Sequence, residues 1–163
     1  MDRFVSTFLN KIDVKGRVSV PAPFRAVLEH DRYGQGALPG VYCYPSLDAP
    51  ALDAGGESLA SKIDALLTGL SDYSDERDQL SVALYGDVHI LKIDGDGRIV
   101  LPEELKRHAK LESEVTFVGL GQKFQIWQPA AFEAYRADAR GRARDHRQLF
   151  AGRRSGGDEP SGG

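Results

Sequence analysis

The sequence predicts an α+β protein, mainly β, built from two similar halves. Two observations lead to this prediction. A segment with the character of two strands joined by a turn occurs twice, and in each copy a proline is followed by a short helical segment and then by an aromatic strand. A unit of about 45 residues buries too little apolar surface to be stable alone. We therefore expect the two copies to pack together as a pseudo-symmetric pair.

The duplicated segment covers residues 11–21 and 92–102. It reads Lys-Ile-Asp-Val-Lys-Gly-Arg-Val-Ser-Val-Pro in the first copy and Lys-Ile-Asp-Gly-Asp-Gly-Arg-Ile-Val-Leu-Pro in the second, with six of eleven positions identical. In the first copy Val18 and Val20 alternate with a serine, which indicates a strand with one buried face. Chance is a poor explanation for such a match, so the duplication is architectural.

Glycine and proline define the ends of each predicted element. Gly16 and Gly97 fall where a tight hairpin requires a positive φ, which glycine adopts at little steric cost. Pro21 and Pro102 end the second strand and suit the first turn of a helix, because proline has a fixed φ and no amide hydrogen. Downstream, we match an aromatic strand at 41–45 with one at 124–129, each ending at a proline.

Between the copies, the chain has the pattern of two amphipathic helices. The first shows an apolar stripe at helical spacing, formed by Leu59, Ile63, Leu66, Leu67 and Leu70. Ser74 can cap the second helix, which Gly86 is expected to end. A third helix can open at Pro129, and Gly141 weakens it by about 1 kcal/mol. The last dozen residues, rich in Gly, Ser and Pro, are expected to be disordered.

Charge is unevenly distributed along the chain. The 163 residues carry a net charge of −3, which by itself argues against a nucleic-acid partner. Counting charges segment by segment weakens this argument against a nucleic-acid partner. Residues 45–80 carry eight acids and two bases, whereas 136–154 carry seven arginines and two aspartates. Residues 1–33 have a net charge of +2. The arginine-rich tail is either an additional nucleic-acid contact or a solvated helix.

No pattern of reactive side chains predicts catalysis or a cofactor. The four histidines lack metal-ligand spacing, no phosphate-binding loop is present, and the single Cys43 falls in an aromatic, buried strand. Residues 94–103 are only superficially similar to a calcium loop, since Ile99 stands where glycine is needed. No run is apolar enough to cross a membrane. We expect a cytoplasmic protein that binds no metal, cofactor or small-molecule substrate.

The remaining candidate site is the Asp-x-x-Gly-Arg turn of each copy. In the structural interpretation, the aspartates accept turn amides and the arginines pair with them. In the functional interpretation, a two-stranded ribbon enters a DNA groove and its arginine fork meets phosphate or guanine. Lys15 and Arg17 favour the first copy for phosphate contact, because Asp96 stands beside Arg98 in the second.

These motifs, together with Lys-Phe-x-x-Trp at 123–127, resemble those of the MraZ family of bacterial transcriptional regulators from about residue 4 to 135. The resemblance implies a double-split, swapped-hairpin β-barrel of two tandem AbrB-like units with flanking helices. It also implies ring-shaped homo-oligomers that bind double-stranded DNA at short direct repeats upstream of their own division and cell-wall operon. The family's DNA contacts correspond here to seven residues, namely Asp13, Lys15, Gly16, Arg17, Asp94, Gly97 and Arg98.

On this basis we expect AbrB-like units at 7–54 and 88–132, a helical connector at 55–87, and an Arg-rich tail at 133–163. The expected function is a DNA-binding regulator, more specifically a repressor, associated with the nucleoid. Two alternatives remain open, a non-DNA oligomeric protein scaffold and an antitoxin-like AbrB module. Two fused units argue against the antitoxin, since such modules usually carry one.

Overall fold

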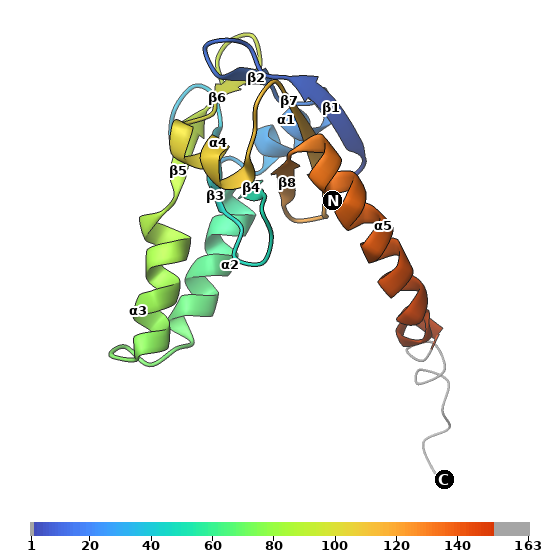
Figure 1. Cartoon of the computed structure of the whole chain (residues 1–163). Coiled ribbons are helices and arrows are strands. Elements are labelled where there is room, and N and C mark those ends of the chain that lie inside the picture. The colour runs from blue at the N-terminus through green and yellow to red at the C-terminus, as the bar shows by residue number, and fades with distance from the viewer. Residues whose placement is uncertain (1, 152–163) are drawn as a thin grey trace. The chain divides into compact units, whose positions relative to one another are not determined.

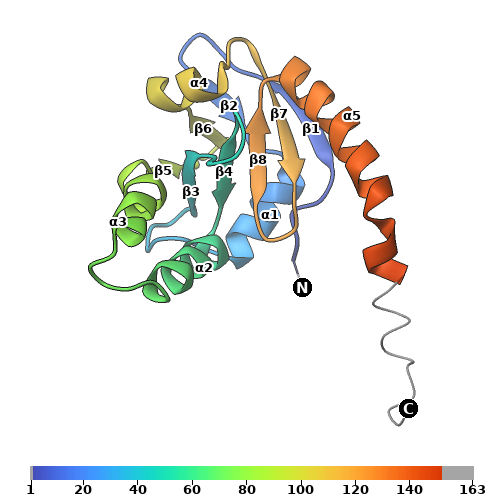
Figure 2. The same ribbon diagram turned by 60° about the horizontal axis from the view of Figure 1, so that its bottom comes forward.

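The computed structural model describes residues 2–151, which divide into a first compact unit ending at Pro129 and a second beginning at Ala130. Figures 1 and 2 show the elements of the first unit. Its strands are β1 (Thr7–Lys11), β2 (Arg17–Ser19), β3 (Gly40–Pro45), β4 (Leu52–Gly55), β5 (His89–Lys92), β6 (Arg98–Val100), β7 (Glu114–Gly119) and β8 (Phe124–Trp127). Its helices are α1 (Ala22–His30), α2 (Glu57–Thr68), α3 (Asp75–Ser81), the π-helix η1 (Val82–Gly86) and α4 (Glu103–Ala109).

The strands form a six-stranded sheet in the order β1-β7-β8-β4-β3-β5 and a two-stranded sheet of β2 and β6. Every named pair is antiparallel. Helices α1 and α4 each follow a proline, Pro21 and Pro102, as the sequence predicts. The predicted α+β class, with antiparallel sheets and flanking helices, is confirmed.

The two copies of the repeat exchange strands throughout the first unit. β1 pairs with β7 of the second copy, and β5 of the second copy pairs with β3 of the first. β2 pairs with β6 and β4 pairs with β8, so both of these ladders also join the copies. Because most strands of each copy find their hydrogen-bond partners in the other, the copies form a single interleaved structure.

Our matching of the aromatic strands at 41–45 and 124–129 was wrong. Two strands, not one, follow the helix in each copy, and β3 borders β5 just as β7 borders β1. The counterpart of β3 is therefore β7, and that of β8 is β4. Neither β4 nor β7 was predicted. The residues of β4, Leu-Asp-Ala-Gly, have little intrinsic preference for strand, whereas those of β7, Glu-Val-Thr-Phe-Val-Gly, are typical of a strand. All four residues of β4 are buried between β3 and β8, which supply the pairing.

The main core draws inward-facing side chains from both copies. Val18 of β2 and Ile99 of β6 are buried opposite each other, and Cys43 of β3 is buried nearby as predicted. Phe24 of α1 is wholly buried at the centre of an aromatic group. Its ring centroid lies 5.0–6.2 Å from those of Phe4, Phe8, Phe117 and Phe124.

The connector contains the predicted helices, with two differences from the predicted stripe. Leu66 is 55% exposed, because α2 packs through the narrower line of Leu59, Ile63 and Leu67. Leu70 lies beyond the helix, which ends at Thr68, and is only partly buried. Figure 1 shows α2 and α3 at the opposite end of the unit from the β1–β2 and β5–β6 turns. The acidic connector is thus separated in space from the candidate site.

The second connector helix begins after Ser74 and ends at Gly86, both as predicted, but its last part is a π-helix and not an α-helix. The Ser74 hydroxyl accepts a hydrogen bond from the Arg77 amide at 3.2 Å, which confirms the cap. The helix then widens into η1, closed by the Asp87 amide donating to the Val82 carbonyl at 2.8 Å. The buried Tyr42 hydroxyl donates to the Leu84 carbonyl at 2.6 Å, so the sheet satisfies a helix carbonyl and fixes the widened turn.

The described part of the second unit consists largely of α5 (Pro129–Asp145), which confirms the third predicted helix. Within it, the Arg136 guanidinium lies 4.7 Å from the ring centroid of Phe132, and Arg142 pairs with Asp138 at 2.9 Å. The disorder predicted for the last dozen residues lies outside the described residues. None of the helices in the described range is long and apolar enough to cross a membrane.

Candidate nucleic-acid interface

The first turn is organised around the carboxylate of Asp13. Its Oδ1 accepts hydrogen bonds from the amides of Lys15 at 2.9 Å and Arg17 at 2.8 Å, and its Oδ2 accepts from Arg17 Nε at 2.6 Å. Gly16 has φ +80°, the positive value that the sequence predicts, and its amide donates to the Asp13 carbonyl at 3.0 Å. Aspartate thus fixes both the turn and one edge of the arginine, leaving the two terminal guanidinium nitrogens without a partner among the described residues.

The second turn repeats this arrangement with one additional acid. Asp94 Oδ1 accepts from the amides of Asp96 and Arg98 at 2.8 and 3.0 Å, and its Oδ2 accepts from Arg98 Nε at 3.3 Å. Gly97 has φ +79°. Here, however, Arg98 Nη2 donates to Asp96 Oδ2 at 3.2 Å. Arg98 therefore forms ion pairs with two carboxylates, whereas Arg17 forms an ion pair with one.

The same hydrogen bonds stabilise the ionised form of both central carboxylates. The pKa of Asp13 is lowered chiefly by the Arg17 amide, and the pKa of Asp94 chiefly by the Arg98 amide. Desolvation opposes this, while the guanidinium of the same arginine adds to it. Each carboxylate remains charged under ordinary conditions and continues to orient its arginine.

The β2–β6 ribbon places both arginines on one face. Arg17 is opposite Val100, and Ser19 is opposite Arg98, so all four side chains lie on the same side of the ribbon. The alternate residues, Val18 and Ile99, enter the core. Since Arg17 and Arg98 are diagonal neighbours across the ribbon, their Cα atoms are about 7–8 Å apart. The two turns therefore present one continuous surface.

Each turn is also tied to the opposite copy. The Gly16 carbonyl accepts from the Leu101 amide at 2.9 Å, and the Gly97 carbonyl accepts from the Val20 amide at 2.9 Å. The structure thus brings together all seven residues that the sequence predicts for the site. It supports the structural interpretation of the Asp–Arg pairs, and it also leaves Lys15 and Arg17 open at the surface.

Two basic residues that the sequence analysis did not assign to the site also lie at these turns. Arg25 of α1 lies against Gly97, and Lys106 of α4 lies close to Gly16. They occupy matching positions in the two repeats, after Phe24 and Leu105. That match is the signal that could have identified them, but the turn each one reaches follows only from the exchange of strands between the copies.

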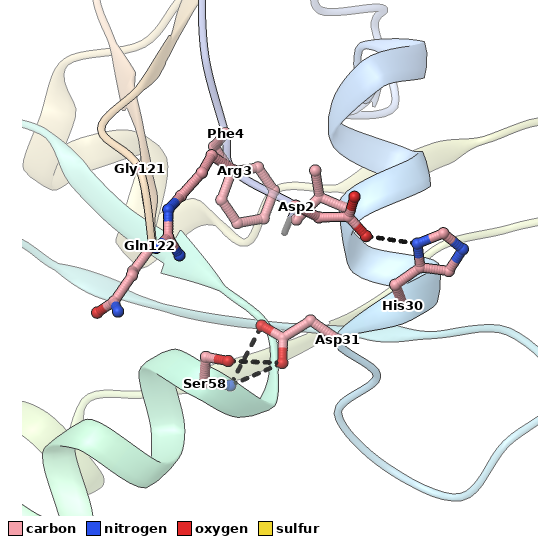
Figure 3. A pocket seen from close by; sticks show the side chains of 9 residues that line it. Asp2, Arg3, Phe4, His30, Asp31, Ser58, Gly121 and Gln122 are labelled. Atoms are coloured by element: carbon pink, nitrogen blue, oxygen red, sulfur yellow. Dashed lines mark hydrogen bonds and ion pairs between the residues drawn. The ribbon is translucent and has the colours of Figure 1, made fainter.

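Another candidate is a hollow of about 300 Å³ near the N-terminus, shown in Figure 3. Four of its polar side chains are paired with each other. His30 Nδ1 lies 2.5 Å from Asp2 Oδ2, and the Asp31 carboxylate accepts from the Ser58 hydroxyl at 2.9 Å. Across residues 2–151, no group of three or more His, Cys, Asp or Glu side chains is placed to hold a metal ion.

The structure thus presents two Asp–Arg turns on one ribbon of an interleaved α+β fold. Comparison with known proteins identifies the family. A family model described as "MraZ protein, putative antitoxin-like" matches residues 84–150. Transcriptional regulator MraZ of Methylocella silvestris is 52% identical over 98% of this chain and 94% of its own length. The corresponding protein of Beijerinckia indica subsp. indica is 53% identical over 94% of this chain and 90% of its own. The chain belongs to the MraZ family of transcriptional regulators.

Proposed function

We propose that this chain is a sequence-specific DNA-binding repressor of the division and cell-wall operon that contains its own gene. It binds short direct repeats upstream of that operon as a ring-shaped homo-oligomer, on the nucleoid in the cytoplasm. The observation that carries the proposal is the open cationic surface of the first turn. Lys15 is exposed, and the terminal nitrogens of Arg17 have no acidic partner among the described residues.

The geometry suits a duplex. A two-stranded ribbon fits the major groove of DNA, and an arginine fork can donate to a phosphate or to the O6 and N7 atoms of guanine. Asp13 holds the Nε edge of Arg17, which orients the fork outward and lowers the entropy lost on binding. The acidic helices α2 and α3 lie at the other end of the unit, away from an approaching phosphate backbone.

Assembly compensates for the small number of cations in each chain. DNA affinity and its salt dependence scale with the number of phosphates neutralised, so one or two open cations bind weakly. In a ring, later contacts become intramolecular, which multiplies weak affinities when operator spacing matches subunit spacing. Tandem direct repeats provide that spacing.

We further propose that the interleaved sheets form the double-split barrel of two AbrB-like units, at 7–54 and 88–132, with a helical connector at 55–87 and a tail at 133–163. The exchange of β1 and β5 between the copies, and the bridge between Ile12 and Val18, support this assignment. In this arrangement the swapped hairpins carry the DNA-binding turns.

Substitution of Arg17 provides the direct test. Arg17→Ala is expected to abolish binding to a fragment from upstream of the gene in a gel-shift titration, while the oligomer mass is unchanged. Arg98→Ala is expected to do less, because its charge is already balanced by Asp94 and Asp96. Lys62→Ala removes the same charge from the exposed surface of α2 and provides the matched control. Unaltered affinity of the Arg17 variant would refute the assignment.

The alternative in a different class is a scaffold whose hairpins only hold the fold together, and an antitoxin-like module is a further one. The salt dependence of binding distinguishes the scaffold hypothesis from the regulator hypothesis. Specific binding that weakens steeply between low and physiological salt supports the regulator, whereas salt-insensitive protein association supports the scaffold. Footprinting on the DNA upstream of the gene then locates the operator.

A further inference from the structure

Arg25 occupies an unusual place beside the second turn. It belongs to α1 of the first copy, yet its guanidinium lies where a side chain on Gly97 of the second copy would be. Its Nη1 donates to the Val20 carbonyl at 3.0 Å, next to the Val20 amide that donates to the Gly97 carbonyl. These contacts hold the guanidinium against the turn.

No acidic side chain among the described residues balances the charge of Arg25. Within residues 2–151 it makes no ion pair, and its hydrogen bond to a neutral carbonyl uses only one of its donors. By contrast, Arg98 on the same turn meets both Asp94 and Asp96. The cation available at the second turn is therefore contributed by the other copy of the repeat.

The first turn shows the opposite arrangement. Its helix residue, Lys106, pairs with Glu103 at 2.8 Å and is the more neutralised of the two helix cations. The turn itself carries Lys15 where the second turn carries Asp96. Each turn thus has a cation without an acidic partner among the described residues. At the first turn this cation, Lys15, belongs to the turn itself, whereas at the second turn it is Arg25 of α1.

We propose that Arg25 is a DNA-phosphate-binding residue of this protein and serves the second turn in place of Arg98. The inference rests on the proposed function, because it names a contact within the same DNA-binding surface. Its physical basis is charge balance. A phosphate approaching Arg98 also meets two carboxylates, whereas one approaching Arg25 meets a guanidinium with unused donors.

The test compares matched variants of the full chain with a fragment from upstream of the gene, across a salt series. Arg25→Gln is expected to weaken binding by about tenfold or more, since hydrogen bonds to charged groups are among the strong ones. It should also make the salt slope shallower by about 0.9 for each engaged subunit. Lys106→Gln at the matching position and Arg98→Gln on the same turn are both expected to have smaller effects.

A second substitution separates charge from folding. Asp96 has a 79% exposed side chain, so Asp96→Lys gives the second turn the residue of the first without disturbing the core. Asp96→Lys alone should strengthen binding and steepen the salt slope. Combined with Arg25→Gln, it should restore both affinity and slope, which a merely structural role of Arg25 would not allow.

The outcomes distinguish the two proposals. If the wild-type protein fails to bind the fragment, or Arg17→Ala binds normally, the proposed function is wrong. If Arg17→Ala abolishes binding but Arg25→Gln keeps the wild-type affinity and slope, only the role of Arg25 is overturned. A larger loss from Arg98→Gln than from Arg25→Gln also overturns it, as does failure of Asp96→Lys to compensate.

Discussion

Substituting the two turn glycines with alanine should have unequal effects, although both have nearly the same backbone conformation. Gly16 and Gly97 have φ values of +80° and +79°, so alanine at either position costs about 1–2 kcal/mol of backbone strain. A Cβ at Gly16 would lie 3.3 Å from the Leu101 carbonyl oxygen, which demands only a small adjustment. A Cβ at Gly97 would overlap the guanidinium of Arg25 and displace it.

Displacing Arg25 also breaks its hydrogen bond to the Val20 carbonyl, which contributes about 0.5–1.5 kcal/mol. We therefore expect Gly16→Ala to lower the free energy of unfolding by about 1–2 kcal/mol, and Gly97→Ala by about 1.5–3.5 kcal/mol. For a chain of this size each kcal/mol corresponds to roughly 2–4 °C in Tm.

Urea denaturation followed by Trp127 fluorescence measures the difference, and a gel-shift titration in parallel measures DNA binding. Equal stability losses, or a greater loss in Gly16→Ala, would refute the reasoning. In the Arg25→Gln background the extra cost of Gly97→Ala should largely disappear, because the overlapping guanidinium is gone. An extra cost that persists would assign it to the backbone of the turn and not to Arg25.

Four further predictions concern stability and the tail. Phe24→Leu introduces the residue found at the matching position 105 and should cost about 1–3 kcal/mol in urea denaturation, because the wholly buried ring contacts four others. The lowered pKa values of Asp13 and Asp94 contribute stability that is present above the unfolded value of about 4 and is lost as the pH falls below it. The Tm between pH 6 and pH 3 should therefore fall less steeply in an Asp13→Asn, Asp94→Asn double variant. Burial raises the pKa of Tyr42 to about 12, so its contribution is complete below about pH 10 and is lost as the pH rises toward 12, which thermal melts of wild type and Tyr42→Phe can measure. Removing residues 136–163 should leave the salt slope of DNA binding unchanged if the Arg-rich helix is merely solvated, and a shallower slope would assign it a DNA contact.

Local sequence predicted much of the site because its geometry is local. Asp13, Gly16 and Arg17 lie within five residues, and their hydrogen bonds close a single turn. Likewise, the prolines before α1 and α4 and the cap at Ser74 act on their immediate neighbours. The sequence was less informative about strand formation and burial that depend on tertiary packing. β4 has no strand signal of its own, and Leu66 is exposed despite its helical spacing.

By itself, the sequence determined the duplication, the paired turns and the separation of acidic from basic segments. Each is encoded by residue types at short spacing, so composition and pattern are enough to recognise it. Only the tertiary structure decided which helix lies beside which turn. Arg25 and Gly97 are far apart along the chain, and they meet because β2 pairs with β6 rather than within its own copy. Strand exchange of this kind depends on long-range pairing, which no local pattern encodes.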